Sequence, residues 1–328
     1  MPRSAVLRPR PGDFSRPPWL TQVEGRPRSV GVELEFIGPT AETTARALAA
    51  EFGGTVREVD PHSFAVEGSR LGNLGVELDT RYAHPDKTDP ALLGGFGPAL
   101  ASWIGAAASY FLPCEIVTSP IPIERLHEVD AMVDVLRELG AKGTQDGALY
   151  AFGLHFNIEA PNFGAQTIAS VLKAFVLLNG WLRRQVAPDA TRNFLGFADP
   201  FPEPFVRRLA EADYRPSVPE LIDDYLAANP TRNRDLDLLP LLLFLDEARV
   251  RAVLPNEKIN GRPAFHYRLP DSRVSDPGWS IAPEWNRWVA VERLAADPER
   301  LDMVGRAYLE FPGEAKSWAD VVERIALT

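Results

Sequence analysis

Acidic side chains alternate with apolar ones in two short segments of this chain. In GVELEF, Glu33 and Glu35 point to one face of an expected strand, and in GVELDT the corresponding face carries Glu77 and Asp79. A strand face in water usually mixes Thr, Lys, Arg and Gln with carboxylates, because adjacent like charges repel each other. Several carboxylates on adjacent strands are instead what a hard divalent cation such as Mg²⁺ requires. We therefore predict a divalent metal site on one face of a sheet, with the wet face of half-buried strands as the alternative.

Four further segments with the same alternation add polar side chains. They contribute Glu67, Glu115, His155, Asn157, Glu159, His266 and Arg268. Imidazole and carboxylate groups together can bind a metal ion, and a guanidinium group can neutralise phosphate. The sequence has one cysteine, Cys114, which excludes an internal disulfide and a cluster of thiolate ligands. Oxygen and imidazole groups must therefore hold any metal ion.

The common nucleotide-binding and hydrolase motifs are absent from the sequence. It contains no GxxxxGK[ST] loop, no HExxH and no GxSxG, and GGFGPAL breaks the GxGxxG pattern at its last position. The lack of a phosphate-binding loop does not exclude ATP. It means that metal ions and side-chain cations would have to meet the charge of the phosphates.

Strands and helices must position these residues. Alternation with period 2 predicts strands at 30–36, 63–68, 74–80, 115–119 and 150–160. Helical spacing and end signals predict helices at 40–52, within 89–111, and at 122–139, 164–186, 202–212, 217–228, 236–248, 283–295, 297–310 and 315–326. A late strand at 263–270 also carries polar residues on one face, so we expect it to join the same sheet.

This pattern predicts an α+β fold with a largely antiparallel sheet, helices packed on one side and a helical C-terminal lobe. Residues 1–29 hold six prolines and six arginines without apolar periodicity, which predicts an irregular arm. Residues 30–328 are expected to form a single domain. It would be rich in strands over 30–160 and rich in helices over 161–328.

The composition limits the classes of partner that we expect for this chain. The 328 residues carry a formal charge of −10 and a pI of about 5.1, which argues against a nucleic-acid backbone as partner. No stretch of about 18 uninterrupted apolar residues occurs, and the first residues lack the apolar segment of a secretory signal. We expect no membrane partner and a cytoplasmic location.

An ordered set of motifs resembles the bacterial amidoligase family. The set is GVELEF, a second acidic strand, EIVTSP before a helix, GLHFNIE, and NRDLDLLPLL with RPAFHYRLP, spread over roughly residues 30–310. That family belongs with the glutamine synthetase and γ-glutamylcysteine ligase fold. The resemblance implies an ATP-dependent ligase: ATP phosphorylates a carboxylate, and an amine then displaces phosphate from the acyl phosphate.

The resemblance also implies residue roles. Glu33, Glu35 and Glu115 match metal-binding glutamates, His155 matches a histidine that contacts metal or the ATP phosphates, and Arg268 matches an arginine that neutralises phosphate. The implied catalytic residues are Arg268, His155 and Glu115. The implied metal ligands, for Mg²⁺ or Mn²⁺, are Glu33, Glu35, Glu77, Glu115, His155 and His266. Arg262, Arg234 and Lys258 are the further candidates for ATP binding, with a surface charge as the alternative reading of each.

Two positions depart from the family pattern. Where the family often has a second histidine, this chain has Asn157, and where the late strand usually carries a glutamate, it has His266. These replacements motivate two alternatives to a ligase: a catalytically inactive binding or scaffold protein, and a Mg²⁺-dependent phosphohydrolase. For the ligase, the expected substrates are a small-molecule or peptide carboxylate and an amine. The amine would be an amino acid, or ammonia delivered by a partner glutamine amidotransferase.

Three residues that could suggest chemistry are better explained by packing. Trp285 and Trp288 lie three positions apart in an expected helix, which favours packing over base stacking. Cys114 precedes Glu115 and so faces the apolar side of its strand, where it is expected to be a small buried hydrophobe.

Overall fold

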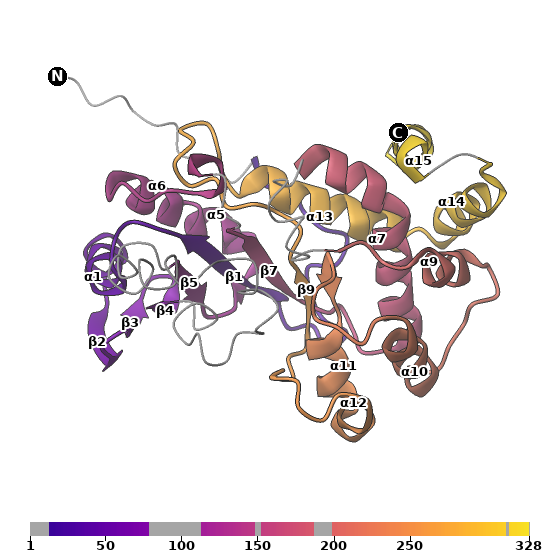
Figure 1. Cartoon of the computed structure of the whole chain (residues 1–328), viewed down its shortest axis with the longest axis horizontal. Coiled ribbons are helices and arrows are strands. Elements are labelled where there is room, and N and C mark those ends of the chain that lie inside the picture. The colour runs from indigo at the N-terminus through magenta and orange to yellow at the C-terminus, as the bar shows by residue number, and fades with distance from the viewer. Residues whose placement is uncertain (1–12, 79–112, 148–151, 187–198, 313–314, 328) are drawn as a thin grey trace, which may run out of the picture.

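A single antiparallel sheet is the centre of the fold (Figure 1). The computed structural model describes residues 13–78, 113–147, 152–186, 199–312 and 315–327. Within them, nine strands form one sheet in the order β2-β3-β4-β5-β1-β7-β9-β8, with β6 paired to β1. The strands are β1 (Ser29–Phe36), β2 (Thr55–Asp60), β3 (Ser63–Ser69), β4 (Gly72–Leu78), β5 (Cys114–Thr118), β6 (Ile121–Pro122), β7 (Leu154–Glu159), β8 (Leu236–Asp237) and β9 (Ala264–Tyr267).

Helices follow most of these strands in the chain. They are α1 (Ala41–Phe52), α5 (Leu126–Val129), α6 (Ala131–Glu138), α7 (Ala165–Val186), α9 (Glu203–Ala210), α10 (Val218–Ala228), α11 (Leu239–Leu245), α12 (Glu247–Val253), α13 (Ala282–Ala295), α14 (Pro298–Glu310) and α15 (Ala315–Ala326). Thr40 caps α1 as expected, because its hydroxyl accepts a hydrogen bond from the Thr43 amide at 3.2 Å. In Figure 1, α7 and α13 run side by side, and α9, α14 and α15 lie beyond α7.

Aromatic rings join the apolar face of the sheet to α7 and α13. Phe156 of β7 packs edge-on against Trp285, and Tyr267 of β9 contacts both Phe175 of α7 and Trp288 of α13. Each of these rings is buried in one continuous apolar core. The packing roles predicted for Trp285 and Trp288 are confirmed, and Cys114 is buried in the same core.

Helix α7 contributes a large part of this apolar core. It has 22 residues and is long and apolar enough to cross a membrane by length and composition alone. In this structure 61% of its apolar window is buried inside the fold, as is typical of a central helix in a globular core.

The prediction of a large antiparallel sheet with helices is confirmed. Every pairing between the named strands is antiparallel, and β9 pairs with β7, so the late strand joins the sheet as expected. Asp79, the first residues of the 150–160 strand and the helix expected within 89–111 lie outside the described residues.

Three details differ from the expectation. Strand β2 was not predicted, because this edge strand is mostly exposed and so has no apolar alternation. The helix expected over 122–139 is interrupted at Asp130, whose carboxylate accepts a hydrogen bond from the Ile281 amide at 2.7 Å. The segment 236–248 begins as strand β8 and then forms two helices, separated at Asp246, which ends α11 and caps α12.

Candidate metal and anion site

Opposed side chains share one face of the sheet. Glu33 of β1 lies opposite His155 of β7, and Glu35 lies opposite Glu115 of β5, which is opposite Glu77 of β4. Because directly paired residues of an antiparallel sheet point to the same face, these five side chains line one surface. The apolar residues between them point to the opposite face, toward α7 and α13.

The carboxylates at one end of this surface form an oxygen-rich group. One ligand atom from each of Glu35, Glu115 and His155 lies within 4.8 Å of the other two. Glu35 is held in place because one of its oxygens accepts a hydrogen bond from the Gly153 amide at 2.8 Å. Glu77 is partly exposed beside Glu115 and belongs to neither of the two groups of metal-ligating side chains found among the described residues. Two carboxylates and an imidazole are a donor set that fits Mg²⁺ or Mn²⁺.

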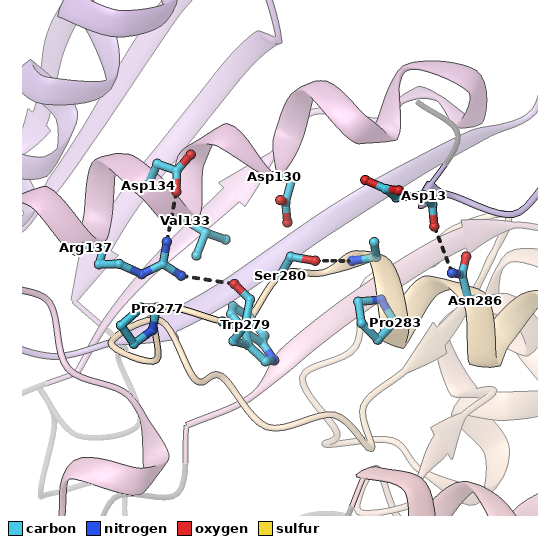
Figure 2. A pocket seen from close by; sticks show the side chains of 12 residues that line it. Asp13, Asp130, Val133, Asp134, Arg137, Pro277, Trp279, Ser280, Pro283 and Asn286 are labelled. Atoms are coloured by element: carbon cyan, nitrogen blue, oxygen red, sulfur yellow. Dashed lines mark hydrogen bonds and ion pairs between the residues drawn. The ribbon is translucent and has the colours of Figure 1, made fainter. Parts of the chain in front are cut away.

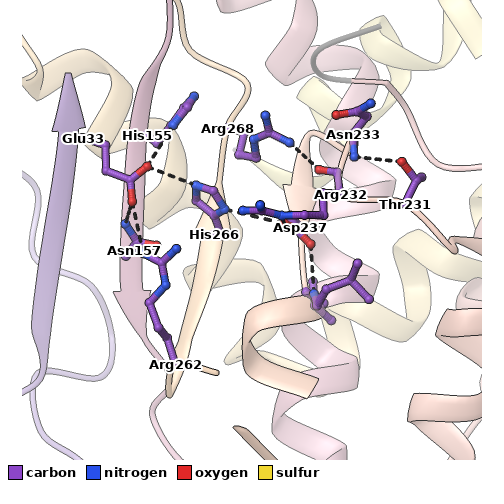
Figure 3. A network of polar contacts seen from close by, with 12 residues as sticks. Glu33, His155, Asn157, Thr231, Arg232, Asn233, Asp237, Arg262, His266 and Arg268 are labelled. Atoms are coloured by element: carbon purple, nitrogen blue, oxygen red, sulfur yellow. Dashed lines mark hydrogen bonds and ion pairs between the residues drawn. The ribbon is translucent and has the colours of Figure 1, made fainter. Parts of the chain in front are cut away.

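Glu33 organises the other end of the surface (Figure 3). Its Oε1 accepts hydrogen bonds from Asn157 Nδ2 at 2.7 Å and from Arg262 at 3.1 Å. Its Oε2 lies 3.2 Å from His155 Nδ1 and 3.6 Å from His266 Nε2. The two imidazole rings lie edge to face, with centroids 5.3 Å apart. Glu33, His155 and His266 form the second group of potential metal ligands.

Burial and hydrogen bonding set the protonation states of Glu33 and His155. Desolvation lowers the pKa of His155 to about 4, so its ring is neutral at pH 7. Burial by itself would raise the pKa of Glu33, but hydrogen bonding by His155 and the proximity of His266 outweigh it and hold that pKa well below the ordinary value. Glu33 is therefore an ionised carboxylate beside a neutral imidazole, and both can act as metal ligands.

Asp237 and Arg232 complete the site beside His266. Asp237 Oδ2 lies 3.7 Å from His266 Nδ1 and 3.6 Å from Arg232 Nε. Sequence reasoning missed Asp237 because it placed this residue at the start of a helix. The available signal was the alternation of Asp235 and Asp237 in RDLDLL, which is typical of a strand with two acidic positions on one side.

The predicted cations reach the site to different degrees. Arg262 contacts Glu33 directly. Arg268, the residue that follows β9, is buried and donates a hydrogen bond to the Arg232 carbonyl (Figure 3). Arg234 turns elsewhere, donating to the Pro200 carbonyl at 2.7 Å. Lys258 is exposed, and it contacts these residues through its backbone carbonyl, which accepts a hydrogen bond from Arg232. The structure thus brings Arg262, Arg268 and Arg232 together beside the acidic residues.

Two of the alternating acidic residues have other partners. Glu159 is buried at the end of β7, where it accepts hydrogen bonds from the Ser29 amide and hydroxyl and pairs with Arg26. Glu67 is exposed on the edge hairpin and pairs with Arg57 at 2.6 Å. Both residues are occupied by ion pairs away from Glu33.

A separate cavity of about 260 Å³ lies between α6 and the start of α13 (Figure 2). Asp130, Asp134 and Trp279 are among its lining residues, and none of its lining residues belongs to a strand of the sheet. Arg137 already pairs with Asp134 at 2.8 Å and donates to the Trp279 carbonyl. This cavity is therefore distinct from the polar surface of the sheet.

Comparison with known sequences identifies one family. A protein family described as "Putative amidoligase enzyme" matches residues 26–290 of the chain. The matched region contains every strand of the polar surface, from β1 to β9. No curated protein and no solved structure matches the chain.

Proposed function

Because the chain belongs to this amidoligase family, we propose that it is an ATP- and Mg²⁺-dependent carboxylate-amine ligase with a glutamine synthetase-like fold. The observation that carries the proposal is the meeting of carboxylates, imidazoles and arginines on one face of an antiparallel sheet. We also propose that residues 30–328 act as one catalytic domain. The pairing of the late strand β9 with β7 supports this, since it places residues from both halves of the chain in one site.

Glu35 and Glu115 would hold Mg²⁺, because they offer the oxygen donors that this ion prefers. A bound divalent ion would supply positive charge that neutralises the phosphates of ATP. The arginines provide the remaining positive charge. Arg262 and Arg268 approach the acidic surface from its β9 side, and their guanidinium groups suit the oxygens of a phosphoryl group.

The proposed reaction has two steps. An oxygen of the substrate carboxylate attacks the γ-phosphorus of ATP, the bond to the β-phosphate oxygen breaks, and ADP leaves. The amine nitrogen then attacks the acyl carbon, loses a proton, and displaces phosphate to leave an amide. The first step brings two anions together, so Arg262 and Arg268 would lower the repulsion by facing the phosphoryl group from fixed positions.

The substrates would be a small-molecule or peptide carboxylate and an amine. The net charge of −10 favours approach of a cationic amine weakly, through long-range attraction. Ammonia from a glutamine amidotransferase partner is the second source that we propose for the nitrogen.

Three assays on the purified chain separate the ligase from its alternatives. With Mg²⁺, ATP, a mixture of the common amino acids and ammonium, a ligase releases ADP only when carboxylate and amine are both present. Hydroxylamine in place of ammonium should trap the acyl phosphate as a hydroxamate. Release of ADP without an amine or hydroxylamine would indicate a phosphohydrolase, and failure to bind any nucleotide would indicate a scaffold protein.

A further inference from the structure

His266 is a buried imidazole whose ring nitrogens lack hydrogen bonds. The residue is 3% exposed, and neither Nδ1 nor Nε2 has a hydrogen-bond partner in the structure. Buried polar atoms without partners are uncommon in folded proteins and require an explanation. Both nitrogens are nevertheless aimed at carboxylates, since Nε2 faces Glu33 at 3.6 Å and Nδ1 faces Asp237 at 3.7 Å.

The spacing around His266 Nε2 suits a metal ion. Glu33 Oε2 lies 3.2 Å from His155 Nδ1 and 3.6 Å from His266 Nε2. Donor atoms about 2.1 Å from a common ion, at tetrahedral or octahedral angles, lie about 3.0 to 3.4 Å apart. The two distances are close to that range, and Glu33 Oε1 is already bound by Asn157 and Arg262. Oε2 is thus the oxygen of Glu33 that faces the two rings.

Asp237 supplies the support that a metal-binding histidine usually has. A histidine ligand commonly directs its other ring nitrogen at a carboxylate, which sets the ring orientation and the tautomer. Asp237 is fully buried, its Oδ1 accepts from the Leu239 amide at 2.9 Å, and its Oδ2 faces His266 without a hydrogen-bond partner. Asp237 is therefore fixed by the start of α11 with one oxygen directed at the ring.

The donor set differs from the one that Mg²⁺ requires. Mg²⁺ is bound mainly by oxygen, whereas Glu33, His155 and His266 offer one oxygen and two nitrogens. We propose that Glu33, His155 and His266 form a site for a borderline divalent transition-metal ion, such as Zn²⁺ or Co²⁺, that rejects Mg²⁺. The inference rests on the proposed function only in that it names the metal ion bound at one end of the polar sheet surface to which that function is assigned. Binding can be measured without ATP or any ligase substrate.

The test is a titration of the full chain, freed of metal with a chelator, with Co²⁺. Binding to nitrogen donors should appear as visible d–d absorption that saturates and is abolished by Zn²⁺. An excess of about 1,000-fold Mg²⁺ over Co²⁺ should leave the absorption unchanged. If that excess of Mg²⁺ removes the absorption, or if no absorption develops, the wild-type protein alone overturns the inference.

Variants then locate the ion. Loss of a group that only supports a metal ligand weakens binding about 10- to 100-fold, and Asp237→Asn should weaken Co²⁺ binding by that amount. His266→Ala removes a ligand itself, so it should weaken Co²⁺ binding by more. His62→Ala, at an exposed turn, is the matched control and should bind as the wild type does. His266→Glu should bind Co²⁺ in competition with Mg²⁺. Unchanged absorption in folded His266→Ala would place the ion elsewhere. Amide formation is not measured in any arm, so this failure would leave the ligase proposal standing.

Discussion

Glu33 and Glu35 share a strand face but have different surroundings. Glu35 lies opposite another carboxylate, Glu115, whereas Glu33 lies opposite the imidazole of His155 and is bound by Arg262. The close approach of Glu35 and Glu115 is costly without a cation between them, because like charges repel. Glu35 is consequently the residue whose charge best tests the oxygen-rich group.

Glu35→Gln should lower Mg²⁺-dependent ATP consumption by at least about 100-fold while leaving the melting temperature unchanged or higher. The amide oxygen of glutamine can still accept from the Gly153 amide, and the substitution removes the negative charge. Glu67→Gln, at an exposed position on β3 of the same sheet, is the control and should retain full activity. Full activity in Glu35→Gln would remove this residue from the metal site.

Arg268→Lys should lower ATP consumption about 10-fold or more, although it keeps the positive charge. Lysine cannot present two parallel N–H groups to phosphate while also donating to the Arg232 carbonyl, as the planar guanidinium can. Arg57→Lys, exposed on β2, serves as the control. Equal rates for the wild type and Arg268→Lys would place Arg268 outside the phosphate contacts.

Much of the polar surface could be predicted at the residue scale, because period-2 alternation places acidic residues on one strand face. The alternation of Glu33 and Glu35, and of His155 and Asn157, with apolar residues was sufficient for this prediction. The partners of these residues were not predictable. Alternation cannot show that Glu159 is bound by Ser29, or that Arg234 turns toward Pro200, since both contacts join distant parts of the chain.

At the scale of elements, Asp130 links α6 to the start of α13. Burial raises the pKa of Asp130 from 3.8 to about 6, with Asp134 and Asp13 adding to the shift and the Ile281 amide and Arg137 opposing it. The folded protein therefore holds this proton more tightly than the unfolded chain does. The stability contributed by Asp130 is fully present below about pH 4 and is lost as the pH rises through 6.

Asp130→Asn should thus become more stable relative to the wild type as the pH rises from 4 to 8. The gain should be at most about 3 kcal/mol, because the asparagine oxygen still accepts from the Ile281 amide and no charge is buried. Chemical unfolding across this pH range measures it. Asp60→Asn is the control, since Asp60 also accepts a backbone hydrogen bond but is exposed. A difference between Asp130→Asn and the wild type that does not change with pH would contradict the assignment.

Elements with a clear apolar period were predictable, and those without one were not. Strands β1 and β5 and helices α13 and α14 lie close to their expected bounds. Strand β2 is nearly all exposed, and the two residues of β8 are too few to show a period. Asp237 was missed because its segment was expected to be helical, whereas the pairing of β8 with β9 brings it to His266.

At the scale of the whole molecule, a buried ion pair ties the segment before β1 to α13. Arg28 donates two hydrogen bonds to Glu292, at 2.7 and 2.9 Å, and two more to the Glu159 carbonyl, and both charged side chains are fully buried. These partners are 264 positions apart in the chain, so no local pattern could reveal them. The pair holds the start of β1 against the helix that covers the sheet.

Glu292→Gln should destabilise the protein by about 3 to 5 kcal/mol, because it leaves the Arg28 charge buried without its counter-charge. Urea unfolding measures the cost. Exposed Glu299→Gln should change stability by less than about 0.5 kcal/mol. The double variant Arg28→Met with Glu292→Leu should recover much of the loss. A cost below about 1 kcal/mol for Glu292→Gln would show that the pair does not hold these segments together.

The central claim is that one face of the sheet binds ATP through a divalent ion held by Glu35 and Glu115. Calorimetric titration with the non-hydrolysable analogue AMP-PNP tests it most directly, with and without Mg²⁺. We expect saturable binding by the wild type with Mg²⁺, no binding after chelation of all divalent ions, and at least about 10-fold weaker binding by Glu35→Gln and Glu115→Gln. Absence of binding by the wild type with Mg²⁺, or equal affinity in both variants, would contradict the account.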